Sequence, residues 1–124
     1  MEDRIIDLIE NTWGEGEEVA LALIYFFDGN EEIINEVIEK ELIFNRYTWD
    51  ISSWTDLGWA LINDDCLDLE NEEPEYFNEL KSYLDDNDEN AVRDMLLQNN
   101  WAIDQENDVA IGFDSDIEVI HHER

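Results

Sequence analysis

Basic residues are scarce in this sequence. Six Lys and Arg stand against 35 Asp and Glu, which gives the 124 residues a formal net charge of −29. So few cations cannot neutralise a series of phosphates, and the excess of anions repels DNA, RNA and anionic lipid at physiological salt. The composition therefore excludes direct nucleic-acid and membrane-surface binding. It favours cationic partners, which are either the basic groove of a protein or metal ions.

Long apolar runs and cysteine are also in short supply. The longest unbroken apolar run is nine residues, Val19 to Phe27, well short of the roughly 20 residues that span a bilayer. The start Met1-Glu2-Asp3 is acidic where a signal peptide is basic, so we expect no export and a cytoplasmic location. Cys66 is the single cysteine. It cannot form an internal disulfide, and we expect a buried, inert thiol in a reducing compartment.

Motifs that carry catalysis or bind metals are missing as well. The sequence has no glycine-rich phosphate loop, no nucleophile elbow and no zinc-ligand spacing. Its two histidines, His121 and His122, are adjacent and close to the C-terminus. A calcium loop beginning at Asp85 fails at two diagnostic positions, where Asn90 replaces Gly and Leu96 replaces Glu. We therefore predict a protein that is not an enzyme and that needs no cofactor and no specific metal.

What the sequence does contain is enough apolar residues for a folded core. Hydrophobic residues make up 44% of the chain and five residues are Trp, whereas disordered acidic chains are poor in aromatics. Helical periodicity predicts helices over 3–11, 17–27, 31–41, 54–63, 74–84 and 91–97. Runs of β-favouring residues predict strands over 42–49, 101–104 and 109–113. These assignments predict an α+β fold, a helix-rich small domain with a short antiparallel β element, and an elongated shape is one alternative. We expect one domain over 1–124, or two sub-lobes over about 1–64 and 65–124.

Polar residues mark several boundaries of these elements. Ser52 or Ser53 is expected to cap the helix that follows. Pro74 suits the first turn of the next helix, because its missing N–H is unpaired there. The run 64–73 is predicted to be an acidic connection, and the run 85–88 is predicted to be a loop that caps the last helix.

Acidic residues recur at helical spacing. Three acids fall at i, i+4 and i+7 in each of the first and third predicted helices: Asp3, Asp7 and Glu10, and Glu32, Glu36 and Glu39. With a rise of about 1.5 Å per residue, successive charges lie roughly 5–6 Å apart, which approaches the spacing of phosphates along a nucleic-acid strand. Duplex DNA carries one charge per ~1.7 Å of axis, so a charge of −29 equals that of about 15 base pairs, or roughly 50 Å of duplex.

An acidic helix face is also an ordinary solvated surface, and a single stripe would need no other explanation. The excess of acids over the whole chain favours a binding role. Arg93 is expected to neutralise a neighbouring carboxylate such as Asp85 or Asp94 rather than to contact the partner. We predict a partner-binding surface formed by the two stripes and by the acids of the runs 64–73 and 85–89: Asp3, Asp7, Glu10, Glu32, Glu36, Glu39, Asp64, Asp65, Asp68, Glu70, Glu72, Glu73, Asp85, Asp86, Asp88 and Glu89.

Several short motifs follow one another in a characteristic order. The first motif runs from Glu17-Glu18-Val19 to Phe27. An acidic turn follows it, then the segment from Glu31-Glu32-Ile33 to Glu39, and then a strand. The run Ser53-Trp54-Thr55-Asp56-Leu57-Gly58-Trp59-Ala60-Leu61-Ile62 comes next, and then Pro74, Tyr83-Leu84-Asp85 and Arg93-Asp94-Met95. This order resembles the middle and C-terminal regions of the ArdA-type antirestriction family over roughly residues 8–113.

The resemblance implies a function. Members of this family are acidic proteins of phages and mobile elements that imitate bent duplex DNA and occupy the DNA groove of type I restriction enzymes. The chain is expected to be a shortened form without the family's N-terminal domain. Ala91-Val92 stands where the family has Tyr-Gly, and the preceding loop is two residues longer. These departures leave the target and the dimer geometry open. Small acidic anti-CRISPR proteins bind Cas nucleases through similar charge complementarity, so a Cas nuclease is a second candidate target. A homodimer is one alternative for the oligomeric state.

Together these observations predict a DNA or nucleic-acid mimic that inhibits a host defence nuclease in the cytoplasm of a bacterial host. The nuclease is either a type I restriction–modification enzyme or a CRISPR–Cas effector, whose basic nucleic-acid groove the inhibitor occupies. Two alternatives remain from other classes. One is an acidic chaperone or cation-buffering protein, and the other is an interaction domain from a halophile, where acidic, Lys-poor surfaces are also found.

Overall fold

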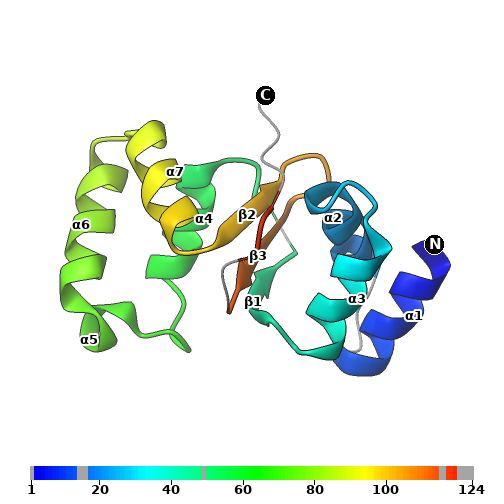
Figure 1. The fold of residues 1–124 in the computed structure, drawn as a ribbon. Coiled ribbons are helices and arrows are strands. Elements are labelled where there is room, and N and C mark those ends of the chain that lie inside the picture. The colour runs from blue at the N-terminus through cyan, green and yellow to red at the C-terminus, as the bar shows by residue number, and fades with distance from the viewer. Residues whose placement is uncertain (1, 14–16, 49, 115–116, 120–124) are drawn as a thin grey trace.

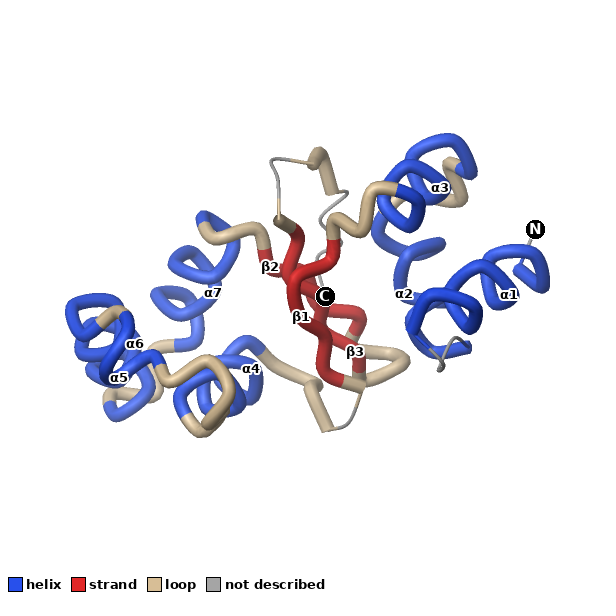
Figure 2. Tube along the Cα trace, turned by 90° about the horizontal axis from the view of Figure 1, so that it is seen from below, coloured by secondary structure: helices blue, strands red, loops and turns tan. Residues whose placement is uncertain are grey.

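A three-stranded antiparallel sheet lies at the centre of the computed structural model, between two groups of helices (Figures 1 and 2). The strand order is β1-β3-β2, so β3 is paired along both edges. The structure describes residues 2–13, 17–48, 50–114 and 117–119, and the side chains of residues 2, 3, 8 and 11–13 lie outside this description. The strands are β1 (Ile43–Tyr47), β2 (Trp101–Asp104) and β3 (Val109–Phe113).

Seven helices are found within the described ranges, three on one side of the sheet and four on the other (Figure 2). The first group is α1 (Glu2–Trp13), α2 (Glu17–Phe26) and α3 (Glu31–Glu39). The second group is α4 (Trp54–Ile62), α5 (Leu69–Glu72), α6 (Pro74–Asp85) and α7 (Glu89–Gln98). This arrangement confirms the predicted helix-rich α+β fold with a small antiparallel sheet. The molecule extends along the line from α1 through the sheet to α6 (Figure 1).

Both faces of the sheet are buried because helices cover each of them. Alternate side chains of a strand point to opposite faces, and all five residues of β3 are buried. Val109, Ile111 and Phe113 pack with the helices α1–α3 in what we call the N-terminal cluster. Ala110 packs with α4, α6 and α7 in the C-terminal cluster. The core therefore consists of two apolar clusters that share one sheet.

The helix α4 lies before the boundary that was expected near residue 64, yet it packs against α6 and α7, which follow that boundary. The described packing therefore crosses the junction between the two expected sub-lobes. The core is divided instead by the sheet, and the C-terminal hairpin contributes side chains to both clusters.

The hairpin of β2 and β3 is confirmed residue for residue, and a buried acid shapes its turn. Asp104 pairs with Val109 at the end of the ladder. Its side chain accepts hydrogen bonds from the backbone N–H groups of Glu106, at 3.1 Å, and Asn107, at 3.3 Å, and from the Asn107 side-chain amide at 2.7 Å. These bonds satisfy the fully buried carboxylate and turn the chain back onto itself.

The strand β1 covers 43–47 of the predicted run 42–49, of which residue 49 lies outside the described residues. Its pairing with β3 contains a β-bulge. Ile43 lies opposite Phe113 and Asn45 lies opposite Gly112, so Phe44 is the additional residue. A bulge redirects the side chain at the irregular position. Phe44 is accordingly 48% exposed, although it lies in a strand of a sheet with buried faces.

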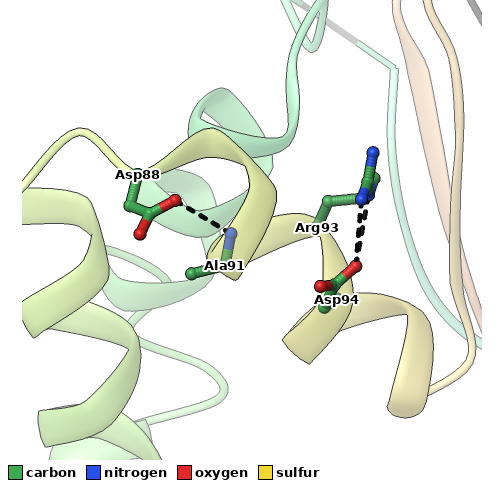
Figure 3. A network of polar contacts seen from close by, with 4 residues as sticks. All are labelled: Asp88, Ala91, Arg93 and Asp94. Carbon is green, nitrogen blue, oxygen red and sulfur yellow. Dashed lines mark hydrogen bonds and ion pairs between the residues drawn. The ribbon is translucent and has the colours of Figure 1, made fainter.

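The predicted caps and helix starts are largely confirmed. The Ser53 hydroxyl accepts a hydrogen bond from the Asp56 N–H at 3.1 Å and is the cap of α4. Asp88 accepts one from the Ala91 N–H at 3.1 Å at the start of α7 (Figure 3). Pro74 occupies the first turn of α6. Each cap satisfies a backbone donor that has no partner within its helix.

Two predictions for the segment between α4 and α6 are wrong. The run 64–73 is not a plain connection, because it contains the short helix α5, and Leu67 and Leu69 anchor it to the C-terminal cluster. Cys66 is exposed rather than buried. It lies in a turn where its N–H donates to the Asp64 carboxylate at 2.9 Å, and the neighbouring Leu67 packs inward in its place.

None of the described helices is both long enough and apolar enough to cross a membrane.

Candidate partner-binding surface

Two acids of α1, Asp7 and Glu10, lie on its solvent face because the apolar residues beside them are buried. Ile5 and Ile9 are fully buried in the N-terminal cluster. Asp7 and Glu10 are exposed, and neither forms an ion pair with another described residue. Asp3 belongs to the same helix, and its side chain lies outside the described residues.

The acidic stripe of α3 follows the same pattern. Ile34, Val37 and Ile38 are buried, and the remaining positions place three acids on the exposed side of the helix: Glu32, Glu36 and Glu39. Of these, Glu36 accepts a hydrogen bond from the Lys40 ammonium group at 2.8 Å. The amphipathic sequence therefore presents a row of carboxylates on a helix that is held from behind by the core.

Ion pairs neutralise few of these charges. Among the described residues there are four ion pairs, and each joins one cation to one carboxylate on the exposed surface: Arg4–Glu31, Lys40–Glu36, Lys81–Asp85 and Arg93–Asp94. The last pair, at 3.2 Å, confirms that Arg93 neutralises Asp94 (Figure 3). Asp85 is paired with Lys81 instead. Exposed pairs of this kind contribute about 0–1 kcal/mol each, and most of the carboxylates have no cation to pair with.

A groove lies between the sheet and the helices α4, α5 and α6, and we call it the acidic groove. Its volume is about 780 Å³. Four carboxylates line it: Asp65, Asp68, Glu72 and Glu73. Its apolar lining is formed by Phe44, Leu61, Leu67, Leu69, Tyr76 and Trp101, and the side chains of Cys66 and Asn99 complete it. The groove therefore combines apolar surface with acidic groups.

The aromatic side chains in this groove are held in fixed positions. Trp101 is only 4% exposed. Its ring meets the Phe44 ring edge-on, with 5.2 Å between the ring centroids, and is stacked on the Tyr47 ring, with 5.8 Å between the centroids. Gly112 makes room for Phe44, since a Cβ atom there would lie 2.6 Å from the ring. The bulge, the glycine and the buried indole together fix Phe44 at the surface.

The negative charge of the groove acts on Tyr76. Burial, together with the nearby carboxylates of Glu73 and Glu79, raises the pKa of the Tyr76 hydroxyl to about 12. The hydroxyl therefore stays neutral at any physiological pH and remains a hydrogen-bond donor.

Glu89 is one of the acids predicted to bind a partner, but its carboxylate is engaged inside the molecule. It accepts hydrogen bonds from the N–H groups of Trp54, at 2.6 Å, and Thr55, at 3.2 Å. Ser53 satisfies the next two donors of α4, through its hydroxyl and its carbonyl group. The N–H groups of Trp54, Thr55 and Asp56, which have no acceptor within α4, are therefore all bonded, and Glu89 joins α7 to α4.

Asp64 is likewise engaged inside the molecule. It accepts a hydrogen bond from the Tyr47 hydroxyl at 2.6 Å and another from the Cys66 N–H at 2.9 Å. Desolvation opposes ionisation of this carboxyl group, but the hydrogen bonds from Tyr47 and from backbone N–H groups outweigh it, so the pKa of Asp64 is lowered. Burial, together with the bond to Asp64, raises the pKa of Tyr47. The pair links β1 to the end of α4.

The remaining predicted acids are distributed over the second group of helices. Asp88 caps α7, and Asp68 accepts hydrogen bonds from the side-chain amide of Asn71 at 3.0 and 3.1 Å. The others are exposed, and the structure shows no hydrogen bond or ion pair for their side chains within its described part: Asp65, Glu70, Glu72, Glu73 and Asp86. The structure thus brings Asp65, Asp68, Glu72 and Glu73 together in the groove. The helices α1 and α3, which carry the two stripes, lie on the other side of the sheet (Figure 1).

The aromatic members of the groove were not predicted from the sequence. Phe44 and Trp101 lie in runs of β-favouring residues, which indicate strands but not which face of the sheet is covered. A bulge leaves no clear mark in a single sequence. Tyr76 lies one position after an exposed glutamate in an amphipathic helix and has the spacing of an ordinary core residue.

No group of three or more His, Cys, Asp or Glu side chains within the described ranges is arranged to hold a metal ion. Comparison of the chain with protein-family models, with curated proteins and with solved structures finds no match. The resemblance to ArdA-type antirestriction proteins therefore stays a prediction. The chemistry that the described surface offers is binding of cationic groups by exposed carboxylates, which needs neither a nucleophile nor a metal.

Proposed function

We propose that this protein is a nucleic-acid mimic that inhibits a host defence nuclease by occupying its basic nucleic-acid groove. The target is a type I restriction–modification enzyme or a CRISPR–Cas effector. The observation that supports this proposal most directly is the set of exposed carboxylates on α1, α3 and the rim of the acidic groove. They are fixed on a folded scaffold, and ion pairs neutralise few of them.

The proposed mechanism is competitive occupancy. Lys and Arg side chains that normally pair with phosphates pair instead with the carboxylates of the inhibitor. Many weak pairs act together, and complementary charge also accelerates the encounter. Folding contributes because the carboxylates are already in place, so less conformational entropy is lost on binding than with a flexible acidic chain.

We propose a smaller set of contact residues than the one predicted from the sequence. Four of the predicted acids accept internal hydrogen bonds, so we do not assign them to the contact surface: Asp64, Asp68, Asp88 and Glu89. Glu36 and Asp85 each carry an exposed ion pair, which a competing cation can replace at small cost. The proposed contacts are the exposed acids without such partners: Asp7, Glu10, Glu32, Glu39, Asp65, Glu70, Glu72, Glu73 and Asp86.

Displacement of DNA tests this proposal. A purified type I restriction–modification enzyme and a purified CRISPR–Cas effector are each loaded with fluorescent duplex DNA, and the protein is titrated in while anisotropy is recorded. We expect displacement from at least one of them. Polyglutamate at the same total charge is the control for unspecific polyanion competition and should displace DNA only at much higher concentration. Retention of DNA by both targets at saturating protein would contradict the proposal, as would equal potency of polyglutamate.

A further inference from the structure

The acidic groove has properties that a mimic of the phosphate backbone does not need. Phosphate mimicry requires spaced negative charges, whereas this groove places a 48% exposed Phe44 beside the half-buried Tyr76 and several leucines. Its volume of about 780 Å³ falls in the range of specific ligand sites, roughly 300–1,000 Å³. The groove is therefore suited to hold apolar groups as well as charges.

Another exposed aromatic residue in the described part of the chain, Trp59, is already covered by a cation. Trp59 is 38% exposed, and the Lys81 ammonium group lies over its ring at 5.5 Å. Within the described part of the chain, no cation lies over Phe44. A ring with acidic neighbours and an uncovered face attracts a cation from outside, because the ring quadrupole and the carboxylates act in the same direction.

We infer that the acidic groove binds a segment of a basic protein in which arginine alternates with large apolar side chains. Arginine fits because its planar guanidinium stacks on aromatic rings and donates two parallel hydrogen bonds to a carboxylate. Glu72 and Glu73 line the groove together with Tyr76 and Phe44. The apolar neighbours of the arginine fill the leucine-lined part of the groove. This inference rests on the proposed function for the identity of the partner, but not for the chemistry of the groove.

The chain carries a built-in reporter for occupancy of the groove. Cys66 is its only cysteine; it is exposed and lines the groove. The rate at which a neutral disulfide such as 4,4′-dithiodipyridine modifies Cys66 should fall when a peptide fills the groove. No mutation is needed for this measurement.

Three fluorescent peptides of eight residues test the inference: alternating Arg and Leu, alternating Arg and Ser, and alternating Glu and Leu. At about 150 mM NaCl, where long-range charge is screened, we expect the Arg–Leu peptide to bind at least about tenfold more tightly than the Arg–Ser peptide, which corresponds to 1.4 kcal/mol. It should also slow Cys66 modification. The Glu–Leu peptide should neither bind nor protect.

Matched variants locate the binding. Phe44→Ala should reduce the affinity for the Arg–Leu peptide to about that for the Arg–Ser peptide. Trp59→Ala, which removes an exposed aromatic ring outside the groove, should leave the affinity unchanged. Because Phe44 also packs on Trp101, a second variant avoids the core. The double substitution Glu72→Gln and Glu73→Gln should weaken binding of the Arg–Leu peptide. The control is the double substitution Glu17→Gln and Glu18→Gln, which makes the same change of charge on the other side of the sheet and should weaken binding less.

Two results would overturn the inference directly: equal affinity for the two arginine peptides, and unchanged Cys66 reactivity with bound peptide. A third is protection of Cys66 that depends only on the concentration of the protein itself, because it would indicate a second copy in the groove. The outcome is separable from that of the proposed function. Loss of peptide binding with intact DNA displacement rejects the groove alone, and peptide binding without DNA displacement rejects the mimicry alone.

Discussion

At the scale of single residues, carboxylates serve two different purposes in this protein. Most are exposed and carry charge into solvent, while a few accept hydrogen bonds that hold the fold together. Glu89 illustrates the second purpose. It accepts hydrogen bonds from the N–H groups of Trp54 and Thr55 at the start of α4, which lie 35 and 34 positions away in the sequence. A single sequence offers no means of telling such an acid from its solvated neighbours.

Replacement of Glu89 by Ala should destabilise the fold by about 1–3 kcal/mol, because two backbone donors lose a charged acceptor. The control is Glu10→Ala, which removes an exposed acid from α1 and should change the free energy of unfolding by less than about 0.5 kcal/mol. Urea unfolding of both variants measures the difference. Similar stability of the two would show that Glu89 is an ordinary surface acid.

The bond between Tyr47 and Asp64 should make a pH-dependent contribution to stability. The pKa of Asp64 is lower in the folded protein than its usual value of 3.8. A lowered folded-state pKa means that the contribution is fully present above the unfolded pKa and is lost as the pH falls through the folded one.

Asp64→Asn should therefore destabilise the protein by about 1 kcal/mol at pH 7, and the difference from the parent should shrink towards pH 3. Asp65→Asn removes the neighbouring exposed acid and serves as the control for the loss of one charge. Thermal unfolding across this range gives the answer. A difference that grows on acidification would contradict the assigned direction of the shift.

At the scale of secondary-structure elements, the periodicity of the sequence predicted most of the helices and strands. The hairpin over 101–104 and 109–113 was predicted residue for residue, because two apolar runs flank a turn of Gln, Glu, Asn and Asp. The helix α5 was missed, since two of its four residues are acidic, one is Asn, and its place depends on Leu67 and Leu69 reaching the core. Cys66 was assigned to the interior on composition alone, and the turn that exposes it depends on Asp64.

The candidate site was predicted only in part for a similar reason. Helical spacing correctly placed Asp7, Glu10 and the α3 stripe on solvent faces. The acidic groove depends on the approach of segments far apart in the chain, namely Phe44, the 61–76 region and Trp101. Such an approach follows from tertiary packing and cannot be derived from local patterns.

The stripe on α3 should act as a unit in binding. A single change such as Glu32→Ala should reduce affinity for the target by about 1 kcal/mol or less, as for other exposed ion pairs. Reversal of Glu32, Glu36 and Glu39 together to Lys should reduce it far more, because like charges then meet in the basic groove of the target. Inhibition assays with variants of matched folding, checked by circular dichroism, compare the two. Loss of all inhibition with one alanine, alongside normal inhibition by the triple variant, would exclude distributed charge as the mechanism.

At the scale of the whole molecule, self-repulsion is the main cost of this surface. A net charge of −29 destabilises the compact state relative to an expanded chain. Protons that bind as the pH falls remove charge, and the native state, where the charges lie closer together, gains more from each proton than the unfolded chain does. By linkage, stability then rises as the pH falls.

We therefore expect a higher melting midpoint at pH 5.5 than at pH 7 in low salt, by about a few degrees. Added NaCl should raise the midpoint at pH 7 through screening. The loss of stability expected when Asp64 is protonated occurs at lower pH. The gain from reduced repulsion and the loss at Asp64 therefore occupy separate pH ranges. A lower midpoint at pH 5.5 would show that specific pairing of carboxylates outweighs their repulsion.

A halophile's interaction domain would share this response to salt, and so would an acidic chaperone with the same charge. Neither would compete with DNA for a defined site. The central claim is therefore tested most directly by the kinetics of inhibition of the target nuclease at several concentrations of duplex substrate. Competitive occupancy predicts that the protein concentration needed for half-inhibition rises in proportion to the duplex concentration once the nuclease is saturated with DNA. A half-inhibitory concentration that does not change with duplex would contradict the account.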